Sequence, residues 1–243
     1  MRAVLATYLR ELRAYFLSPL AYVVAFFFLV INGVLFGMMI TQLAQPGAPS
    51  GPPMGYFFGS TWLILIVLGT ILPMRLLSEE LRSGSIEVLM TAPITEGQVV
   101  AGKYLAALSF FALLWLPTLG YAGILAHYGE VQWGPIAAGY LSVLLVGALF
   151  LSVGTFASAM TKSQLIAAVI TFAILIVLFL VGLLEQLASG EVWKNVFGYL
   201  DISAAMDELG KGVLDTRRLV YYISTSWFFL FLTSRALEDR KWR

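Results

Sequence analysis

The sequence predicts an all-α integral membrane protein with six transmembrane helices. Hydrophobic residues make up 60% of the 243 residues and charged residues only 12%, whereas about 25% of a soluble domain is charged. The apolar residues gather in six runs of roughly 20 residues, the length that a helix needs to cross a bilayer. We therefore expect a single transmembrane domain over residues 1–243.

The composition also argues against several classes of function. A net charge of +1 provides no basic stripe for nucleic acid, and the absence of cysteine excludes disulfides and cysteine-ligated metals. His127 is the only histidine, so the chain lacks the paired histidines of a metalloprotease and offers little for a serine triad. No G-x-x-x-x-G-K-[ST] sequence occurs, so we expect no nucleotide site of that type, no cofactor and no enzyme activity in this chain alone.

Residues 1–19, MRAVLATYLRELRAYFLSP, are expected to form an amphipathic helix that lies in the membrane interface. Apolar residues recur at helical spacing, while Arg2, Arg10 and Arg13 can reach lipid phosphates from the other face. Ser18 and Pro19 should end this helix. The following apolar run is too long for a cleavable signal peptide. The alternative is a lead-in segment with no role of its own.

The six apolar runs give the expected transmembrane helices. The last run is short and aromatic, so its start is less defined than the others. Pro117 should kink the third helix, and Gly33-x-x-x-Gly37 and Gly154-x-x-x-Ser158 allow close approach between helices. The runs are Leu20–Ile40, Tyr56–Met74, Tyr104–Ala126, Ile136–Met160, Leu165–Leu184 and Leu219–Ser234.

The distribution of positive charge predicts the orientation, because cytoplasmic loops are rich in Lys and Arg. Two loops on the opposite side, around residues 46–55 and 127–135, contain neither residue type, and the remaining four basic residues fall in the long loop 185–218. Both termini and the 75–103 loop are therefore expected in the cytoplasm of a prokaryote, with the chain in the plasma (inner) membrane. Eleven of the fifteen basic residues fall on that side: Arg2, Arg10, Arg13, Arg75, Arg82, Lys103, Lys162, Arg235, Arg240, Lys241 and Arg243.

Residues 75–103, RLLSEELRSGSIEVLMTAPITEGQVVAGK, form the longest charged segment between two apolar runs, and we expect its charges to face water. Ser78 can cap a short helix in which Glu79 pairs with Arg82. Gly84 permits a sharp turn before a second short helix. Thr95-x-x-Gln98 matches a capping box at the start of the third transmembrane helix. The segment would form a compact structure on the cytoplasmic surface or, in the simpler interpretation, an ordinary connection between two transmembrane helices.

The other long loop, residues 185–218, is expected outside the cytoplasm. It mixes apolar and charged residues and is too short for a separate folded core. Short amphipathic helices fit it best, one beginning near Ser203 and ending at Gly210 or Gly212.

The 75–103 segment resembles the signature of ABC-2-type transporter permeases. Shared features are an acidic and basic pair (Glu80 and Arg82), Gly84–Ser85, Glu87, the apolar residues 88–90, Pro93 and Gly102–Lys103. The tail, GKGVLDTRRLVYY with the ending LEDRKWR, is similar to the gliding-motility-associated and copper-cluster subgroup. The resemblance covers essentially the whole chain.

The resemblance implies a permease subunit of an ATP-driven exporter. A separate ABC ATPase subunit would bind ATP and Mg²⁺ and dock on the 75–103 loop as a coupling helix, while residues 1–19 with Arg10 and Arg13 would form a connecting helix beside it. A second permease subunit would complete a homo- or heterodimer in the lipid bilayer, with a periplasmic accessory protein as a further candidate partner. The docking residues implied are Glu79, Glu80, Arg82, Gly84, Glu87, Leu89, Met90 and Pro93.

The substrate class and three other functions stay open at this point. The apolar spans favour a lipid-like or amphipathic substrate that is exported, extracted or flipped, because no charged residue lies in the middle of a span. A non-transporting scaffold would instead pass ATP-driven motion to envelope partners through the 185–218 loop. A channel or an intramembrane enzyme fits less well, because no selectivity ring or nucleophile set is present.

Overall fold

The computed structural model describes residues 2–46, 51–85, 94–128, 131–187, 190, 193, 197–198, 200–213 and 215–241. All regular secondary structure in this part of the chain is helical, as the sequence predicts. The helices are α1 (Arg2–Leu17), α2 (Pro19–Leu43), α3 (Pro53–Ser60), α4 (Trp62–Ile71), α5 (Ser78–Ser83), α7 (Glu96–Trp115), η1 (Leu116–Thr118), α8 (Leu119–Tyr128), α9 (Trp133–Met160), α10 (Gln164–Leu187), α12 (Ile202–Gly210) and α13 (Thr216–Lys241).

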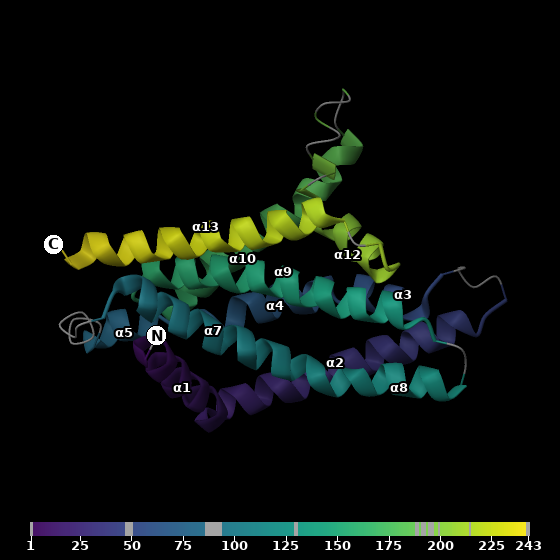
Figure 1. Cartoon of the computed structure of the whole chain (residues 1–243), viewed down its shortest axis with the longest axis horizontal. Helices are drawn as coiled ribbons and strands as arrows, with labels where there is room; N and C mark the ends of the chain where they lie inside the picture. The colour runs from purple at the N-terminus through teal and green to yellow at the C-terminus, as the bar shows by residue number, and fades with distance from the viewer. Residues whose placement is uncertain are drawn as a thin grey trace.

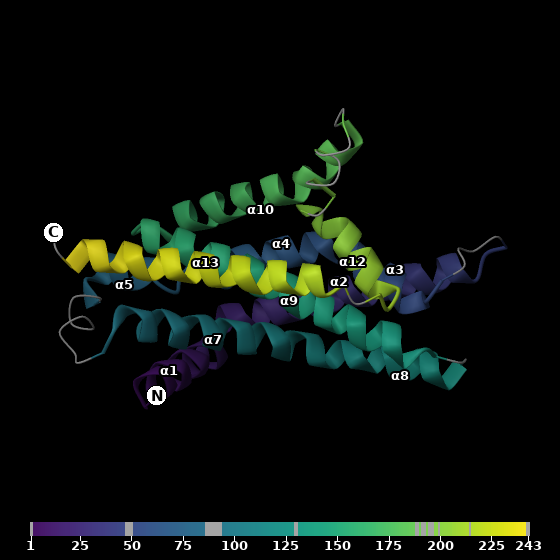
Figure 2. The same cartoon turned by 45° about the horizontal axis from the view of Figure 1, so that its top comes forward.

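The long helices run side by side around α9, which contacts α4, α7, α10 and α13 (Figure 1). Both termini lie at the same end of the bundle as α5, and we call this the charged end (Figure 1). The opposite end carries α3, α8 and α12, and the 45° turn of Figure 2 shows α12 crossing beside α3. The chain thus passes back and forth between the two ends of the bundle, as expected for a multi-pass membrane protein.

Four continuous helical segments are long and apolar enough to cross a membrane: α2, α7 to α8, α9 and α10. A fifth candidate is the pair α3 and α4, which is bent by 43°. These five agree with the first five predicted runs. The bend was not predicted, since the sequence suggests an uninterrupted helix over Tyr56–Met74. It occurs at Thr61, whose hydroxyl donates a hydrogen bond to the carbonyl of Phe58 at 2.7 Å, in the preceding turn of the helix.

The last helix, α13, has 26 residues and runs along α9 from one end of the bundle to the other (Figure 1). Near its start, Arg218 bonds to α12 through Glu208, and near its end Leu237 packs against Leu77 and Leu81 at the charged end. The predicted sixth run lies within this helix. The predicted helix in the 185–218 loop corresponds to α12, whose bounds agree within one residue at its start.

Small residues let α9 approach its neighbours closely. A Cβ on Gly154 would lie only 2.2 Å from Cγ of Pro73, so only glycine fits there. The predicted Gly154-x-x-x-Ser158 contact is therefore confirmed. Within the described part of the chain, a Cβ on Gly33 would lie 3.6 Å from the Tyr121 hydroxyl and a Cβ on Gly37 would have no neighbour within 4 Å, so close helix approach at Gly33-x-x-x-Gly37 stays a prediction. Pro117 lies in the 3₁₀ turn η1, which interrupts the third span where the kink was predicted, although α7 to α8 still form one candidate span.

Candidate functional site

At the charged end, α1 packs directly on the first half of α7. A Cβ on Gly102 would lie 2.8 Å from Cβ of Thr7, so the glycine allows this close approach. The hydroxyl of Tyr8 also donates a hydrogen bond to Ser109 Oγ at 3.2 Å. The predicted break after α1 is confirmed, because α1 ends at Leu17 and α2 begins at Pro19.

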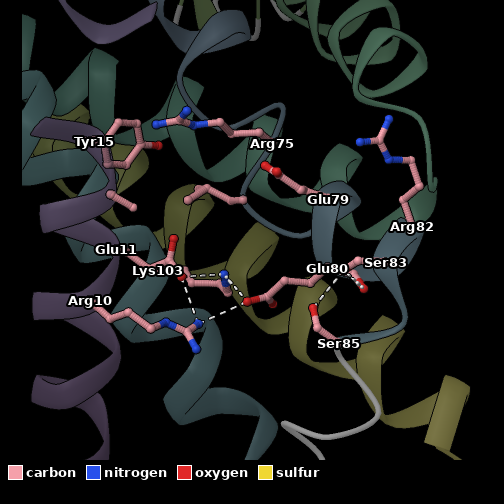
Figure 3. A pocket seen from close by; sticks show the side chains of 12 residues that line it. Arg10, Glu11, Tyr15, Arg75, Glu79, Glu80, Arg82, Ser83, Ser85 and Lys103 are labelled. Atoms are coloured by element: carbon pink, nitrogen blue, oxygen red, sulfur yellow. Dashed lines mark hydrogen bonds and ion pairs between the residues drawn. The ribbon is translucent and has the colours of Figure 1, made fainter. Parts of the chain in front are cut away.

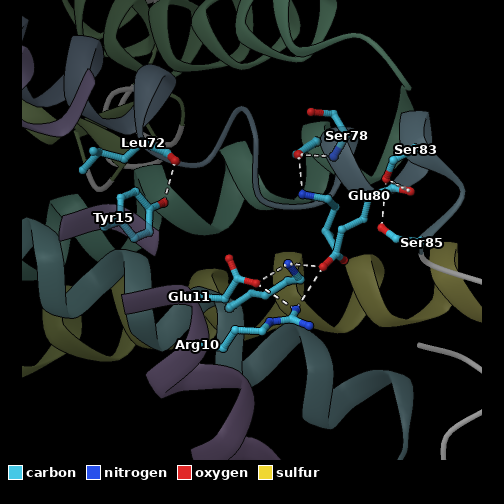
Figure 4. A network of polar contacts seen from close by, with 11 residues as sticks. Arg10, Glu11, Tyr15, Leu72, Ser78, Glu80, Ser83 and Ser85 are labelled. Carbon is cyan, nitrogen blue, oxygen red and sulfur yellow. Dashed lines mark hydrogen bonds and ion pairs between the residues drawn. The ribbon is translucent and has the colours of Figure 1, made fainter. Parts of the chain in front are cut away.

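Four charged side chains from three helices meet where α1, α5 and α7 converge, and we call them the charge cluster: Arg10, Glu11, Glu80 and Lys103 (Figure 4). Lys103 Nζ lies 2.9 Å from Oε1 of Glu11 and 2.9 Å from Oε1 of Glu80. Arg10 Nη2 reaches the same two oxygens at 2.9 Å and 3.0 Å. Two cations therefore share two carboxylates, and the cluster is neutral.

The cluster lies largely away from solvent. The side chain of Lys103 is 1% exposed and those of Glu11 and Glu80 are 16% exposed. Burial alone would raise the pKa of Glu11, but Lys103 and Arg10 outweigh it and hold that pKa below its usual value. The attraction between the ionised side chains thus offsets the hydration that they lose on burial.

This arrangement corrects two expectations. Lys103 was expected to face water at the edge of the 75–103 loop, but it is a buried residue of α7. Arg10 was expected to reach lipid phosphates, but its guanidinium is held by Glu11 and Glu80. Arg13 is exposed.

The short helix α5 is fixed to the bundle by a serine of α9. Ser158 Oγ accepts the backbone N–H groups of Leu77 and Ser78, both at 3.0 Å, and donates to the carbonyl of Met74 at 3.1 Å. The prediction that Ser78 caps this helix is wrong. Ser78 is already helical, and its hydroxyl instead donates back to the carbonyl of Met74.

The turn after α5 and the start of α7 agree with the sequence. Gly84 adopts a left-handed conformation with φ of 73°, as the predicted break requires. Thr95 and Gln98 form the capping box, in which Gln98 Oε1 accepts the Thr95 backbone N–H at 3.3 Å. Of the predicted docking residues, Glu87, Leu89, Met90 and Pro93 lie outside the described residues.

The remaining predicted docking residues are placed differently from one another. Glu80 is held in the charge cluster, so it is not a free surface charge. Glu79 and Arg82 are both exposed, but they do not form the predicted ion pair, and Figure 3 shows their side chains pointing apart.

A cavity of about 550 Å³ opens beside the charge cluster (Figure 3). Arg75 lies along one wall, where its guanidinium stacks 4.8 Å from the ring centre of Tyr15 and donates to Ser18 Oγ at 3.0 Å. Tyr15 in turn donates to the carbonyl of Leu72 at 2.7 Å. The cavity is lined by the charge cluster together with Ala14, Tyr15, Arg75, Leu76, Glu79, Arg82, Ser83 and Ser85.

Sequence reasoning missed two members of this site. Glu11 drew no attention because its partner Lys103 is 92 positions away in the chain. Ser158 was noted as a small polar residue of the fourth span, but its bonds to the start of α5 were not predicted. No group of three or more metal-ligating side chains occurs among the residues that the structure describes.

The fold and site together define a multi-pass helical membrane protein with a network of charged and polar side chains at one end of the helix bundle. Residues 33–236 match the family model described as ABC-2 family transporter protein, which is most of the chain. The chain therefore belongs to the ABC-2 family of transporter proteins. Members of this family are transport membrane subunits that generally pair with an ABC ATPase subunit. No curated protein matches the sequence.

Proposed function

We propose that this chain is the permease subunit of an ATP-driven exporter, and that a separate ABC ATPase docks at the charged end. The observation that carries the proposal is the charge cluster, which ties α5 to α1 and α7. A force applied to α5 would pass into the third span through Lys103 and into the second through the direct connection from α4. Family membership supports the presence of an ATPase partner.

The proposed arrangement in the membrane follows from charge and topology. The charged end faces the cytoplasm and α13 is the sixth span, so both termini lie on the cytoplasmic side of the prokaryotic inner membrane. Two permease subunits form the transport unit. The substrate is lipid-like or amphipathic and is exported, extracted or flipped, because no Asp, Glu, Lys or Arg occurs in the central part of the apolar runs. The similarity of the tail supports the gliding-motility-associated and copper-cluster subgroup.

The docking residues are tested by purifying the chain from its native membrane in mild detergent. We expect an ABC ATPase to co-purify, and the double variant Leu89→Ala/Met90→Ala to lose it, as truncated interface anchors do. The matched control is Leu116→Ala/Leu119→Ala, which removes the same kind of side chain from exposed positions in the third span, outside the proposed docking segments. Recovery of the wild-type chain without any ATPase would contradict the proposal and favour the scaffold.

A further inference from the structure

The cavity at the charged end contains polar groups that the protein leaves without partners. Oε2 of Glu80 is buried and has no hydrogen-bond partner among the residues that the structure describes, although Oε1 of the same carboxylate binds two cations. Glu79 lines the cavity and makes no ion pair with any residue that the structure describes. A buried acceptor without a donor is costly, so this cavity is suited to a ligand that supplies one.

The same cavity offers a cation with unused donors. A guanidinium has five N–H donors, and Arg75 has one hydrogen bond, to Ser18, and one stacking contact, with Tyr15. The charge cluster is neutral by itself, so the charged groups left to face a ligand are the carboxylate of Glu79 and the guanidinium groups of Arg75 and Arg82. A ligand with both a positive and a negative group matches this lining.

An apolar groove lies next to the cavity. It has a volume of about 190 Å³, and its walls come from α2, α7 and the end of α1. Phe110 lines this groove and stacks on Tyr15 with 5.0 Å between ring centres, while Tyr15 lines the charged cavity. A charged cavity and an apolar groove therefore share one aromatic wall. Outside this wall, Phe16 and Leu17 are exposed, as expected of a surface in contact with lipid.

We propose that this paired site binds a phospholipid with a zwitterionic headgroup, and that it prefers a primary ammonium. The lipid phosphate lies against Arg75, the ammonium against Glu79 and Oε2 of Glu80, and an acyl chain in the groove beside Phe110. A primary ammonium has three N–H donors, as in lysine, and can satisfy the buried oxygen. A trimethylammonium has the same charge but no N–H, so phosphatidylcholine can donate no hydrogen bond to Glu79 or to Glu80.

The test uses the full-length chain, purified in detergent and stripped of lipid. Native mass spectrometry measures the binding of phosphatidylethanolamine and of phosphatidylcholine with identical acyl chains. We expect phosphatidylethanolamine to bind roughly tenfold more tightly, the scale of one charge-assisted hydrogen bond. Glu79→Gln should lose most of this preference, and Arg75→Lys should weaken both lipids together. Glu238→Gln, which removes an acid that pairs with Arg235 and does not line the cavity, should retain the preference.

Several results would overturn the proposal. Equal binding of the two lipids, or an unchanged preference in Glu79→Gln, would exclude recognition of the ammonium by this cavity. Soluble phosphoethanolamine binding as tightly as the lipid would exclude a role for the groove. Displacement of the lipid by an ATPase whose docking depends on Glu79 would identify a protein as the occupant. The lipid titration is carried out without ATPase, which is added only in a separate competition, so failure of the titration leaves the proposed transport function untouched.

Discussion

At the scale of single residues, Lys103 is the member of the charge cluster with the largest consequence. It contacts both carboxylates and is 1% exposed, whereas the side chain of Arg10 is 52% exposed. Replacing Lys103 with methionine should leave two partly buried carboxylates with a single shared cation. We expect Lys103→Met to lower the free energy of unfolding by about 3–5 kcal/mol, and Arg10→Gln by about 1 kcal/mol or less.

Thermal or denaturant unfolding in detergent measures both changes. The control is Arg235→Gln, because Arg235 forms an exposed ion pair with Glu238 on the surface of α13. Equal losses in Lys103→Met and Arg235→Gln would mean that the cluster is no more important than a surface pair.

The sequence reveals the residue types of this site better than their roles. Gly102–Lys103 belongs to a recognisable motif, yet Lys103 was expected in water. The reason is physical: periodicity shows only neighbours three or four positions apart, whereas the partners of Lys103 come from α1 and α5. Glu11 lies beside two arginines in a segment expected to lie on the membrane, so nothing local indicates its burial.

At the scale of helices, Ser158 determines how α5 is attached. Its hydroxyl is the acceptor for two backbone N–H groups at the start of α5. We expect Ser158→Ala to destabilise this attachment by about 1–3 kcal/mol and to speed hydrogen exchange at the amides of Leu77 and Ser78. The control is Ser152→Ala on the same helix, since Ser152 is equally buried but bonds only to its own helix at Leu149. Unchanged exchange in Ser158→Ala would show that α5 is held by other contacts.

The contact of α1 with α7 depends on Gly102. We expect Gly102→Ala to push α1 away, because the new Cβ would lie 2.8 Å from Thr7 Cβ and 3.0 Å from the carbonyl oxygen of Val4. Overpacking of this kind costs about 1–3 kcal/mol. Gly97→Ala is the matched control in the same helix, since a Cβ there would lie 3.9 Å from Ser234 Oγ, and it should be neutral or stabilising. Disulfide trapping between cysteines placed in α1 and α7 would measure the separation; equal trapping in both variants would contradict the prediction.

Helix ends were more predictable than helix bends. Pro19, Pro117 and the Thr95–Gln98 box act on their own neighbours, so their effects can be recognised from the sequence. The bend at Thr61 has no proline or glycine at the break itself. It is accompanied by back-bonds from Ser60 and Thr61 to the preceding turn, and such hydroxyl residues are too common in apolar runs to signal a bend. The capping of α5 by Ser158 depends on tertiary packing and has no local signal.

At the scale of the whole molecule, the number of spans depends on α13. Its charged ends weaken its hydropathy, which is why composition alone leaves the sixth span open. A helix of 26 residues is about 39 Å long at 1.5 Å per residue, longer than the roughly 30 Å hydrocarbon core. Its start contacts α12 through Arg218 and its end contacts α5 through Leu237, so the two ends of α13 lie at opposite ends of the bundle.

Side-specific labelling checks the resulting topology. The chain contains no cysteine, so single cysteines give an unambiguous signal with a maleimide that cannot cross the membrane. We expect Ser85→Cys and Asp239→Cys to be labelled from the same side, and Gly134→Cys from the other. All three positions are exposed, and a Cβ at Gly134 would meet no neighbour within 4 Å. Labelling of Ser85→Cys and Asp239→Cys from opposite sides would exclude α13 as a span. It would also place the C-terminus away from α5, against the packing of Leu237.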